Sequence, residues 1–94
     1  MIHILALIRF QPQHSAFVVE AMQQHALNSR LENGCVRYEV YQQLDAATIM
    51  TQETWADASA EAAHMQGPVV AALVAKIGAM LTAAPEVTRY TQVA

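Results

Sequence analysis

The chain has 94 residues, enough for a single domain, residues 1–94, built around one hydrophobic core. Hydrophobic residues make up 54% of it and charged residues only 14%, against about 25% in typical domains, which excludes an intrinsically disordered protein. The net charge is -3 and the five basic residues are scattered, so the sequence offers no basic patch that would bind nucleic acid.

Cysteine use and hydropathy bear on the cellular compartment. Cys35 is the only cysteine, which excludes an intrachain disulfide and favours the reducing cytoplasm. The apolar N-terminal run has neither a basic region nor a cleavage site, so it predicts a strand rather than a signal peptide. The longest apolar stretch, residues 69–81, is too short to span a bilayer and contains Lys76. We therefore expect a cytoplasmic protein without a membrane segment.

The first part of the chain predicts a strand followed by a helix. Residues 2–10 form a β-branched and aliphatic run that is apolar on both faces, so this strand should be central and covered on both sides. Pro12 ends the strand, and apolar residues then recur at helical spacing over residues 13–31. Gly34 follows that helix and suits a left-handed conformation at its C-terminal end.

The remainder predicts a hairpin, two helices and a last strand. A short turn separates the hairpin strands, Gly67-Pro68 separates the two helices, and Pro85 ends the second helix. Asp57 is suited to cap the first of these helices. These elements cover residues 35–44, 48–55, 57–66, 69–82 and 86–93.

The resulting order, β-α-β-β-α-α-β, predicts an α+β fold of the ferredoxin-like type. Such a fold has a four-stranded antiparallel sheet with its helices on one face. The other face would be bare, although the first strand is apolar on both sides. A homodimer that packs sheet to sheet is the simplest arrangement that covers this face.

The sequence lacks the spacing of a metal or phosphate site. One cysteine and four dispersed histidines provide no close pair of metal ligands, and the three isolated glycines provide no phosphate loop. We therefore expect neither a bound metal nor a flavin or haem cofactor. Any chemistry must come from a pocket lined by scattered side chains.

Two positions stand out as carriers of such chemistry. Glu53 and Trp55 lie two residues apart on a strand and so point to the same face, either as a pocket wall with a carboxylate beside it or as ordinary core packing. His64 lies on a helix. It either faces the sheet as a proton acceptor, or is exposed and paired with Glu61.

Other polar residues are weaker candidates. Tyr38 and Tyr41 lie on opposite faces of one strand, so at most one of them lines a given cavity. Arg9 lies on the first strand and is either a polar lining group or an edge group. His25, in the middle of a helix, and Cys35, at the start of a strand, are expected to be structural.

Two segments resemble the signatures of antibiotic biosynthesis monooxygenase domains, in the matching order and spacing. The first reads Glu32-Asn33-Gly34-Cys35-Val36-Arg37-Tyr38 and resembles E-x-G-C-x-x-Y. The second reads Glu53-Thr54-Trp55-Ala56-Asp57, followed by Ala63-His64, and resembles E-x-W-x-D … a-H. The resemblance implies a dimeric α+β barrel with a pocket between helices and sheet. Members include cofactor-free oxygenases of quinols and polycyclic phenols, haem-degrading enzymes and an isomerase of a phosphorylated sugar.

The chain departs from the family pattern at two positions. Many members carry a second histidine five residues after the first, where this chain has Val69. The haem-degrading branch has its proximal histidine where this chain has Val74. The resemblance therefore argues against that branch and against any mechanism that needs a histidine at position 69.

Together these observations favour a cofactor-independent monooxygenase that oxidises a quinol or polyphenolic aromatic substrate with O₂. A phenol with a pKa near 10 gives its proton to a histidine with a pKa near 6.5 at a cost of about 4.8 kcal/mol, so the pocket must stabilise the resulting ions. We expect catalysis at His64, the base, and at Glu53, which orients a polar partner. Substrate binding is expected at Trp55, a stacking wall, and at Tyr38 and Arg9.

Two other functions stay open. In an isomerase or lyase of a small carbonyl compound, Glu53 would move a proton next to the carbonyl, and residues 36–40 resemble the corresponding strand of the autoinducer-phosphate isomerase type. In a non-catalytic module the same fold would only bind a small aromatic molecule. As a pocket residue, His64 should be loosely packed, so that His64→Ala lowers turnover with little loss of stability.

Overall fold

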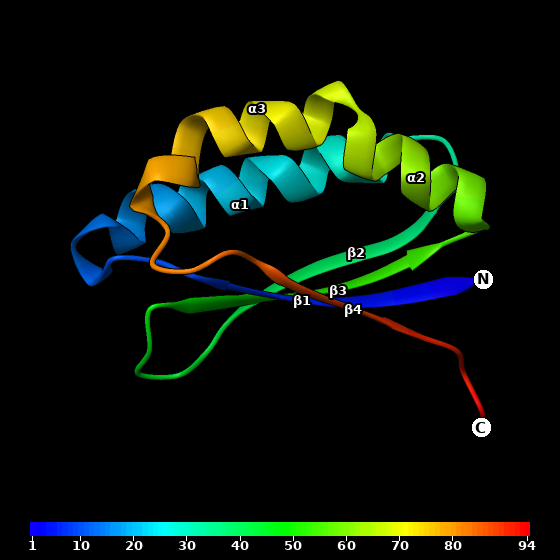
Figure 1. Ribbon diagram of the computed structural model, residues 1–94, viewed down its shortest axis with the longest axis horizontal. Coiled ribbons are helices and arrows are strands. Elements are labelled where there is room, and N and C mark those ends of the chain that lie inside the picture. Colours follow the sequence, from blue (N-terminus) through cyan, green and yellow to red (C-terminus); the bar gives the residue numbers. More distant parts are fainter.

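The structure, a computed structural model that describes residues 1–94, confirms the ferredoxin-like α+β fold. Figure 1 shows the three α-helices on one side of a four-stranded antiparallel sheet. In chain order the elements are β1 (Ile2–Arg9), η1 (Pro12–His14), α1 (Ser15–Arg30), β2 (Cys35–Gln42), β3 (Thr48–Trp55), α2 (Ala58–Gln66), α3 (Pro68–Ile77), η2 (Gly78–Met80) and β4 (Glu86–Tyr90).

Several elements end earlier than the sequence pattern predicts. The first strand stops at Arg9, because Phe10 makes only an isolated bridge to Leu81. The helix expected through residue 82 ends at Ile77 and continues as the 3-10 turn η2. The last strand, expected through residue 93, ends at Tyr90. Tyr90 pairs with His3, the second residue of β1, so β1 has almost no residues left that could pair with positions 91–93.

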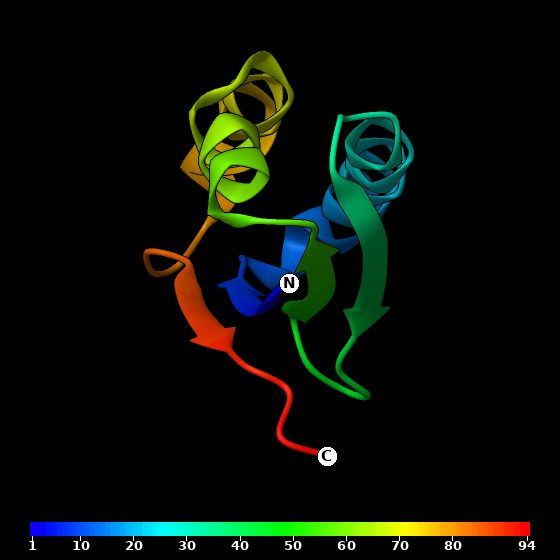
Figure 2. The same cartoon turned by 90° about the vertical axis from the view of Figure 1, so that its right-hand side faces the viewer.

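The strand order is β2-β3-β1-β4, so β1 is an interior strand, as its apolar sequence predicts. Its residues alternate between the two faces of the sheet. Ile4, Ala6 and Ile8 are buried beneath the helices, whereas Leu5 and Leu7 on the other face are only half-buried. Figure 2, seen along the helices, shows both helical columns above the sheet and none below it.

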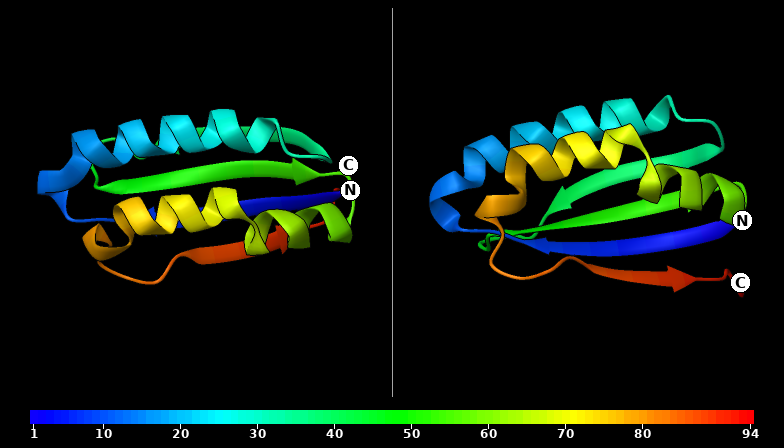
Figure 3. Two further views of the ribbon diagram at one scale, coloured as in Figure 1. Left: turned by 90° about the horizontal axis from the view of Figure 1, so that it is seen from above. Right: turned by 45° about the horizontal axis from the view of Figure 1, so that its top comes forward.

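The helices form a layer in which α1 lies beside α3, while α2 continues from α3 toward the end of the sheet where β3 ends (Figure 3). Two local features determine where α2 begins and how closely the loop after α1 packs against it. Oδ1 of Asp57 accepts a hydrogen bond of 2.8 Å from the backbone N–H of Ala60, which confirms Asp57 as its cap. Gly34 has a φ of +83°, and a Cβ atom there would lie 2.5 Å from Cβ of Ala60. The loop after α1 can therefore approach α2 only because residue 34 is glycine.

The sheet face away from the helices carries several apolar side chains. Tyr41 and Tyr90 are 44% and 52% exposed there, beside the half-buried Leu5, Leu7 and Met50. No element of the chain covers this face (Figure 1). None of the helices could span a membrane.

Candidate functional site

Four aromatic side chains from four different elements meet between the helices and the sheet. They are His25 of α1, Tyr38 of β2, Trp55 of β3 and His64 of α2, and none is more than 5% exposed. The rings of Trp55 and His64 are stacked, with centroids 4.4 Å apart and planes inclined by 29°. We call these four residues the aromatic cluster.

His64 lies inside the protein and between two carboxylates. Its Nδ1 is 2.6 Å from Oε1 of Glu32, and its Nε2 is 3.9 Å from Oε1 of Glu53. The alternative of an exposed His64 paired with Glu61 is wrong, because Glu61 is itself buried and pairs with Nε of Arg89 at 2.7 Å. The Glu61–Arg89 pair links α2 to β4, whereas His64 contacts Glu32 in the loop after α1.

We assign the tautomer of His64 from this arrangement. A carboxylate can only accept a hydrogen bond, so we place the hydrogen on Nδ1, which donates it to Glu32. In the neutral ring Nε2 then keeps its lone pair. At 3.9 Å from Glu53 it is beyond hydrogen-bonding distance, so the lone pair is free to take a proton.

Glu53 is held by its own strand. Its Oε2 accepts a hydrogen bond of 2.7 Å from the Thr51 hydroxyl, and its Oε1 accepts one of 3.0 Å from Nε1 of Trp55. The structure thus confirms that Glu53 and Trp55 share a face. Burial, and then the charge of Glu53, raise the pKa of Tyr38 well above its usual range, so Tyr38 stays protonated.

The aromatic cluster is tightly packed. The four main surface depressions are not lined by Glu53, Trp55 or His64, and His25 is the only cluster residue that lines any of them. The expectation that His64 is loosely packed is therefore wrong, because its ring stacks on Trp55 and bonds to Glu32. We now expect His64→Ala to lower the free energy of unfolding as well as any activity.

Arg9 does not join the other predicted site residues. It lies on the face of β1 opposite Ile4 and Ile8, and so on the far side of the sheet from His64. There its Nη1 pairs with Oε1 of Glu86 at 3.1 Å. Both faces of β1 are apolar, so the sequence did not reveal which one the helices cover.

Cys35 is placed as a half-buried free thiol at the start of β2. Burial, followed by the charges of Glu32 and Glu53, raises the pKa of this thiol, which suits the small structural residue that the sequence predicts. The His, Cys, Asp and Glu side chains form no group of three that could hold a metal ion.

Two residues that contact the site, Glu32 and His25, were not among the site residues predicted from the sequence. Glu32 opens the first family signature, but its contact with His64 spans 32 positions and depends on the turn at Gly34. His25 was expected to be structural. Burial, and then the charge of His64, lower its pKa to about 4, while an interaction with the backbone of Val69 opposes the shift. The only signal for His25 was its place among apolar residues on the inner side of α1.

Comparisons with known proteins agree with the two signatures. The sequence profile of the antibiotic biosynthesis monooxygenase family matches residues 1–76. A crystal structure described as an antibiotic biosynthesis monooxygenase superposes with a TM-score of 0.93 at 20% identity, over 100% of both chains. The structure of a protein from Mycobacterium tuberculosis superposes with a TM-score of 0.89 at 20% identity, over 99% of this chain and 95% of that one. The structure of a protein from Pseudomonas aeruginosa superposes with a TM-score of 0.89 at 21% identity, over 99% of this chain and 94% of that one. No functionally curated protein matches.

Proposed function

Because the chain belongs to the antibiotic biosynthesis monooxygenase family, we propose that it is a cytoplasmic, cofactor-independent monooxygenase that oxidises a quinol or polyphenolic aromatic substrate with O₂. One oxygen atom enters the ring, and the other leaves as water with two hydrogens from the substrate. A quinol thereby becomes a hydroxyquinone. The first step removes a phenolic proton, since a phenolate passes an electron to O₂ more readily than the neutral phenol.

The free lone pair on Nε2 of His64 carries this proposal. Glu32 holds Nδ1 at 2.6 Å, which leaves Nε2 as the nitrogen without a hydrogen-bond partner. None of the four main surface depressions is lined by His64, so a substrate must displace packed side chains to reach Nε2. A proton taken by Nε2 creates a cation 3.9 Å from Glu53, whose carboxylate attracts it.

Trp55 supports the same step. Its ring lies flat against His64, and a cation over an aromatic face gains about 0.5–2 kcal/mol. Its N–H also holds Glu53 in place. We therefore assign the proton transfer to His64 and positioning roles to Glu32, Glu53 and Trp55.

The isomerase or lyase alternative finds less support. It needs Glu53 as the proton-transferring base, yet both oxygens of Glu53 accept hydrogen bonds, from Thr51 and Trp55. Each of these bonds occupies a lone pair of the carboxylate, which makes Glu53 a poor base.

We also propose that two copies pair through the sheet face that the helices leave uncovered. The half-buried Leu5 and Leu7 lie at its centre, between the exposed Tyr41 on one side and Tyr90 on the other. A second copy would cover these side chains, and an isologous contact of this kind is the commonest form of homodimer.

Oxygen consumption with a panel of quinols tests the proposed activity. His64→Gln removes the titrating nitrogen but keeps a side chain that can donate to Glu32, so kcat should fall by about 10²- to 10⁴-fold. His14→Gln is the matched control, because His14 lies on η1, away from the aromatic cluster, and should leave kcat unchanged.

Other results would point elsewhere. No oxygen uptake with any quinol, together with tight binding of one, would indicate the non-catalytic module. Exchange of solvent deuterium into a small ketose phosphate would indicate the isomerase. Oxygen uptake that His64→Gln leaves unchanged would refute the base assignment.

A further inference from the structure

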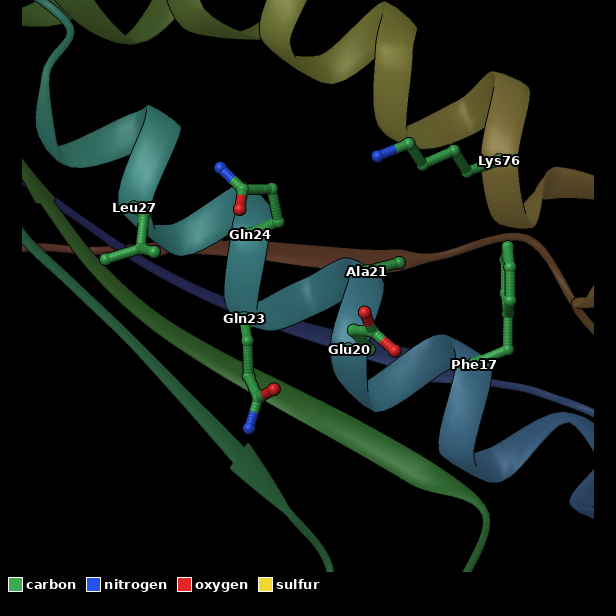
Figure 4. Close-up of a pocket in the computed structure, with 7 residues that line it drawn as sticks. All are labelled: Phe17, Glu20, Ala21, Gln23, Gln24, Leu27 and Lys76. Carbon is green, nitrogen blue, oxygen red and sulfur yellow. The ribbon is translucent and has the colours of Figure 1, made fainter.

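The largest hollow on the protein does not lead to the aromatic cluster. It has a volume of about 500 Å³ and follows the outer face of α1, with Lys76 as the only lining residue from α3 (Figure 4). A second depression reaches the cluster at His25, but its volume of about 20 Å³ holds little more than one water molecule. The other two main depressions are lined by no cluster residue. A substrate therefore reaches the cluster only if one of the surrounding elements moves.

Of the elements that surround the cluster, α2 is the one least held by apolar burial. Its two buried residues, Glu61 and His64, are both polar. By contrast, α1 buries apolar side chains such as Val18 and Met22, and β2 and β3 are bonded into the sheet. From α2 only Ala60, which is partly buried, packs against the apolar core. Segments with few buried apolar contacts open at the lowest free-energy cost, so α2 is the element expected to move.

The two ends of α2 are suited to act as hinges. Asp57 before it and Gly67 after it both have extended backbones, with ψ angles of 175° and 179°. Pro68, next to Gly67, has no N–H with which to continue the hydrogen bonds of α2 into α3. Hinge residues are typically found at such element ends. The helix can therefore turn as a unit between these two residues.

The side of α2 that faces β4 is open to solvent. Ile4 of β1 pairs with Glu53 of β3 on one side and with Arg89 of β4 on the other, so the three lie in one row on the helix-facing side of the sheet. Ile4 and Glu53 are buried, whereas the side chain of Arg89 is 68% exposed. Val87, on the same face of β4, is 44% exposed. The helices thus leave this edge strand uncovered (Figure 3).

One ion pair closes α2 onto β4. Nε of Arg89 lies 2.7 Å from Oε2 of Glu61, and about one turn farther along α2 His64 lies 3.9 Å from Glu53. In the row beneath α2 only Ile4 separates Arg89 from Glu53, so the ion pair stands between solvent and the aromatic cluster. Because Arg89 is largely exposed, the pair is screened by water and is a weak contact.

We propose that α2 is a lid over the aromatic cluster. It turns about Asp57 and Gly67, the Glu61–Arg89 pair separates, and a flat aromatic molecule passes between α2 and β4 to reach Nε2 of His64. The identification of this molecule as the substrate rests on the proposed function, whereas the opening of the lid does not.

Hydrogen exchange of the ¹⁵N-labelled protein, followed by NMR, tests the lid. After correction for intrinsic rates, the amides of α2 should exchange about 10-fold faster or more than those in the middle of α1. Arg89→Gln should accelerate α2 by a further factor of about 3 and leave α1 unchanged. Arg9→Gln is the matched control, because it removes the same charge and the other ion pair of β4, to Glu86 on the far face of the sheet.

Quenching of Trp55 fluorescence by acrylamide measures the same opening from the cluster. Trp55 is the only tryptophan of the chain, is fully buried and stacks on His64 of the lid. Acrylamide is small, flat and uncharged, so it should reach Trp55 mainly when the lid is open. The quenching constant should rise about 3-fold in Arg89→Gln and stay unchanged in Arg9→Gln. Glu61→Gln, which removes the other charge of the pair, should act like Arg89→Gln.

The outcomes separate this inference from the proposed function. Amides of α2 that exchange no faster than those of α1 would overturn the lid, and so would quenching that Arg89→Gln and Glu61→Gln leave unchanged. If Arg89→Gln fails to fold, the exchange of the natural protein and the quenching of Glu61→Gln decide. A lid that opens as expected in a protein that consumes no oxygen with any quinol would refute the monooxygenase alone.

Discussion

At the scale of single residues, His25 should make the stability of the protein depend on pH. Its pKa is about 4 in the folded protein and near 6.5 when unfolded, so the unfolded chain binds more protons between these values. The stabilising contribution is complete above pH 6.5 and is lost as the pH falls toward 4, by about 3 kcal/mol. Urea denaturation at several pH values measures it.

His25→Phe isolates this effect from the acidic residues that titrate in the same range. The variant keeps a ring beside Tyr38 and His64, the titratable neighbours of His25. Its free energy of unfolding should fall less steeply than that of the natural protein between pH 6.5 and 4. If the free energies of unfolding of the two proteins fell in parallel with pH, burial would not be what keeps the His25 ring neutral.

How far the sequence predicts each site residue depends on the range of its contacts. Strand alternation alone places Glu53 beside Trp55, because their spacing of two is a local property. The bond between Glu32 and His64 depends on tertiary structure, since a loop must first bring them together. Arg9 was assigned to the site because alternation groups the residues of a face without saying which face the helices cover.

At the scale of elements, Gly34 couples the loop after α1 to α2. Gly34→Ala puts a side chain at a φ of +83° and only 2.5 Å from Cβ of Ala60. We expect the free energy of unfolding to drop by about 2–4 kcal/mol, from backbone strain and overpacking together. Because α2 carries His64, the variant that remains folded should also lose activity through a longer bond to Glu32. Thermal unfolding and oxygen uptake measure the two effects.

Gly78→Ala is the matched control for this prediction. Gly78 has an ordinary helical φ of -53°, and a Cβ atom there would meet only Cγ1 of Val74, at 3.5 Å. The substitution should therefore be neutral or stabilise by up to about 1 kcal/mol. If both glycine variants behaved alike, the close approach of the loop to α2 would not matter for stability.

Element type is predictable from local signals here, whereas element ends are not. The period of the apolar residues distinguishes strands from helices, and Gly67-Pro68 separates α2 from α3. The end of β4 at Tyr90 depends on where its partner strand begins, which is a property of the sheet register. Likewise, α3 ends at Ile77 and passes into the 3-10 turn η2, although the apolar pattern continues to residue 81.

At the scale of the whole molecule, the sheet has one covered and one open face, and the open face should hold a second copy. Leu5→Glu puts a charge at the centre of that face without touching the helical layer. Burying a leucine contributes about 2 kcal/mol and a homodimer buries two, so the dimer Kd should rise by roughly 10³-fold or more. Sedimentation at micromolar concentration should find the natural chain dimeric and the variant monomeric.

Val74→Glu provides the comparison, because Val74 is 60% exposed on the outer side of α3 and should leave the dimer intact. Monomers of Leu5→Glu should also unfold at lower denaturant concentration, since only dimer formation removes the apolar side chains of the open face from water. A natural chain that sediments as a stable monomer of 10.3 kDa would refute the pairing. In that case Leu5, Leu7 and Tyr90 would remain a solvent-exposed apolar surface on a folded protein, and Leu5→Glu should change neither mass nor stability.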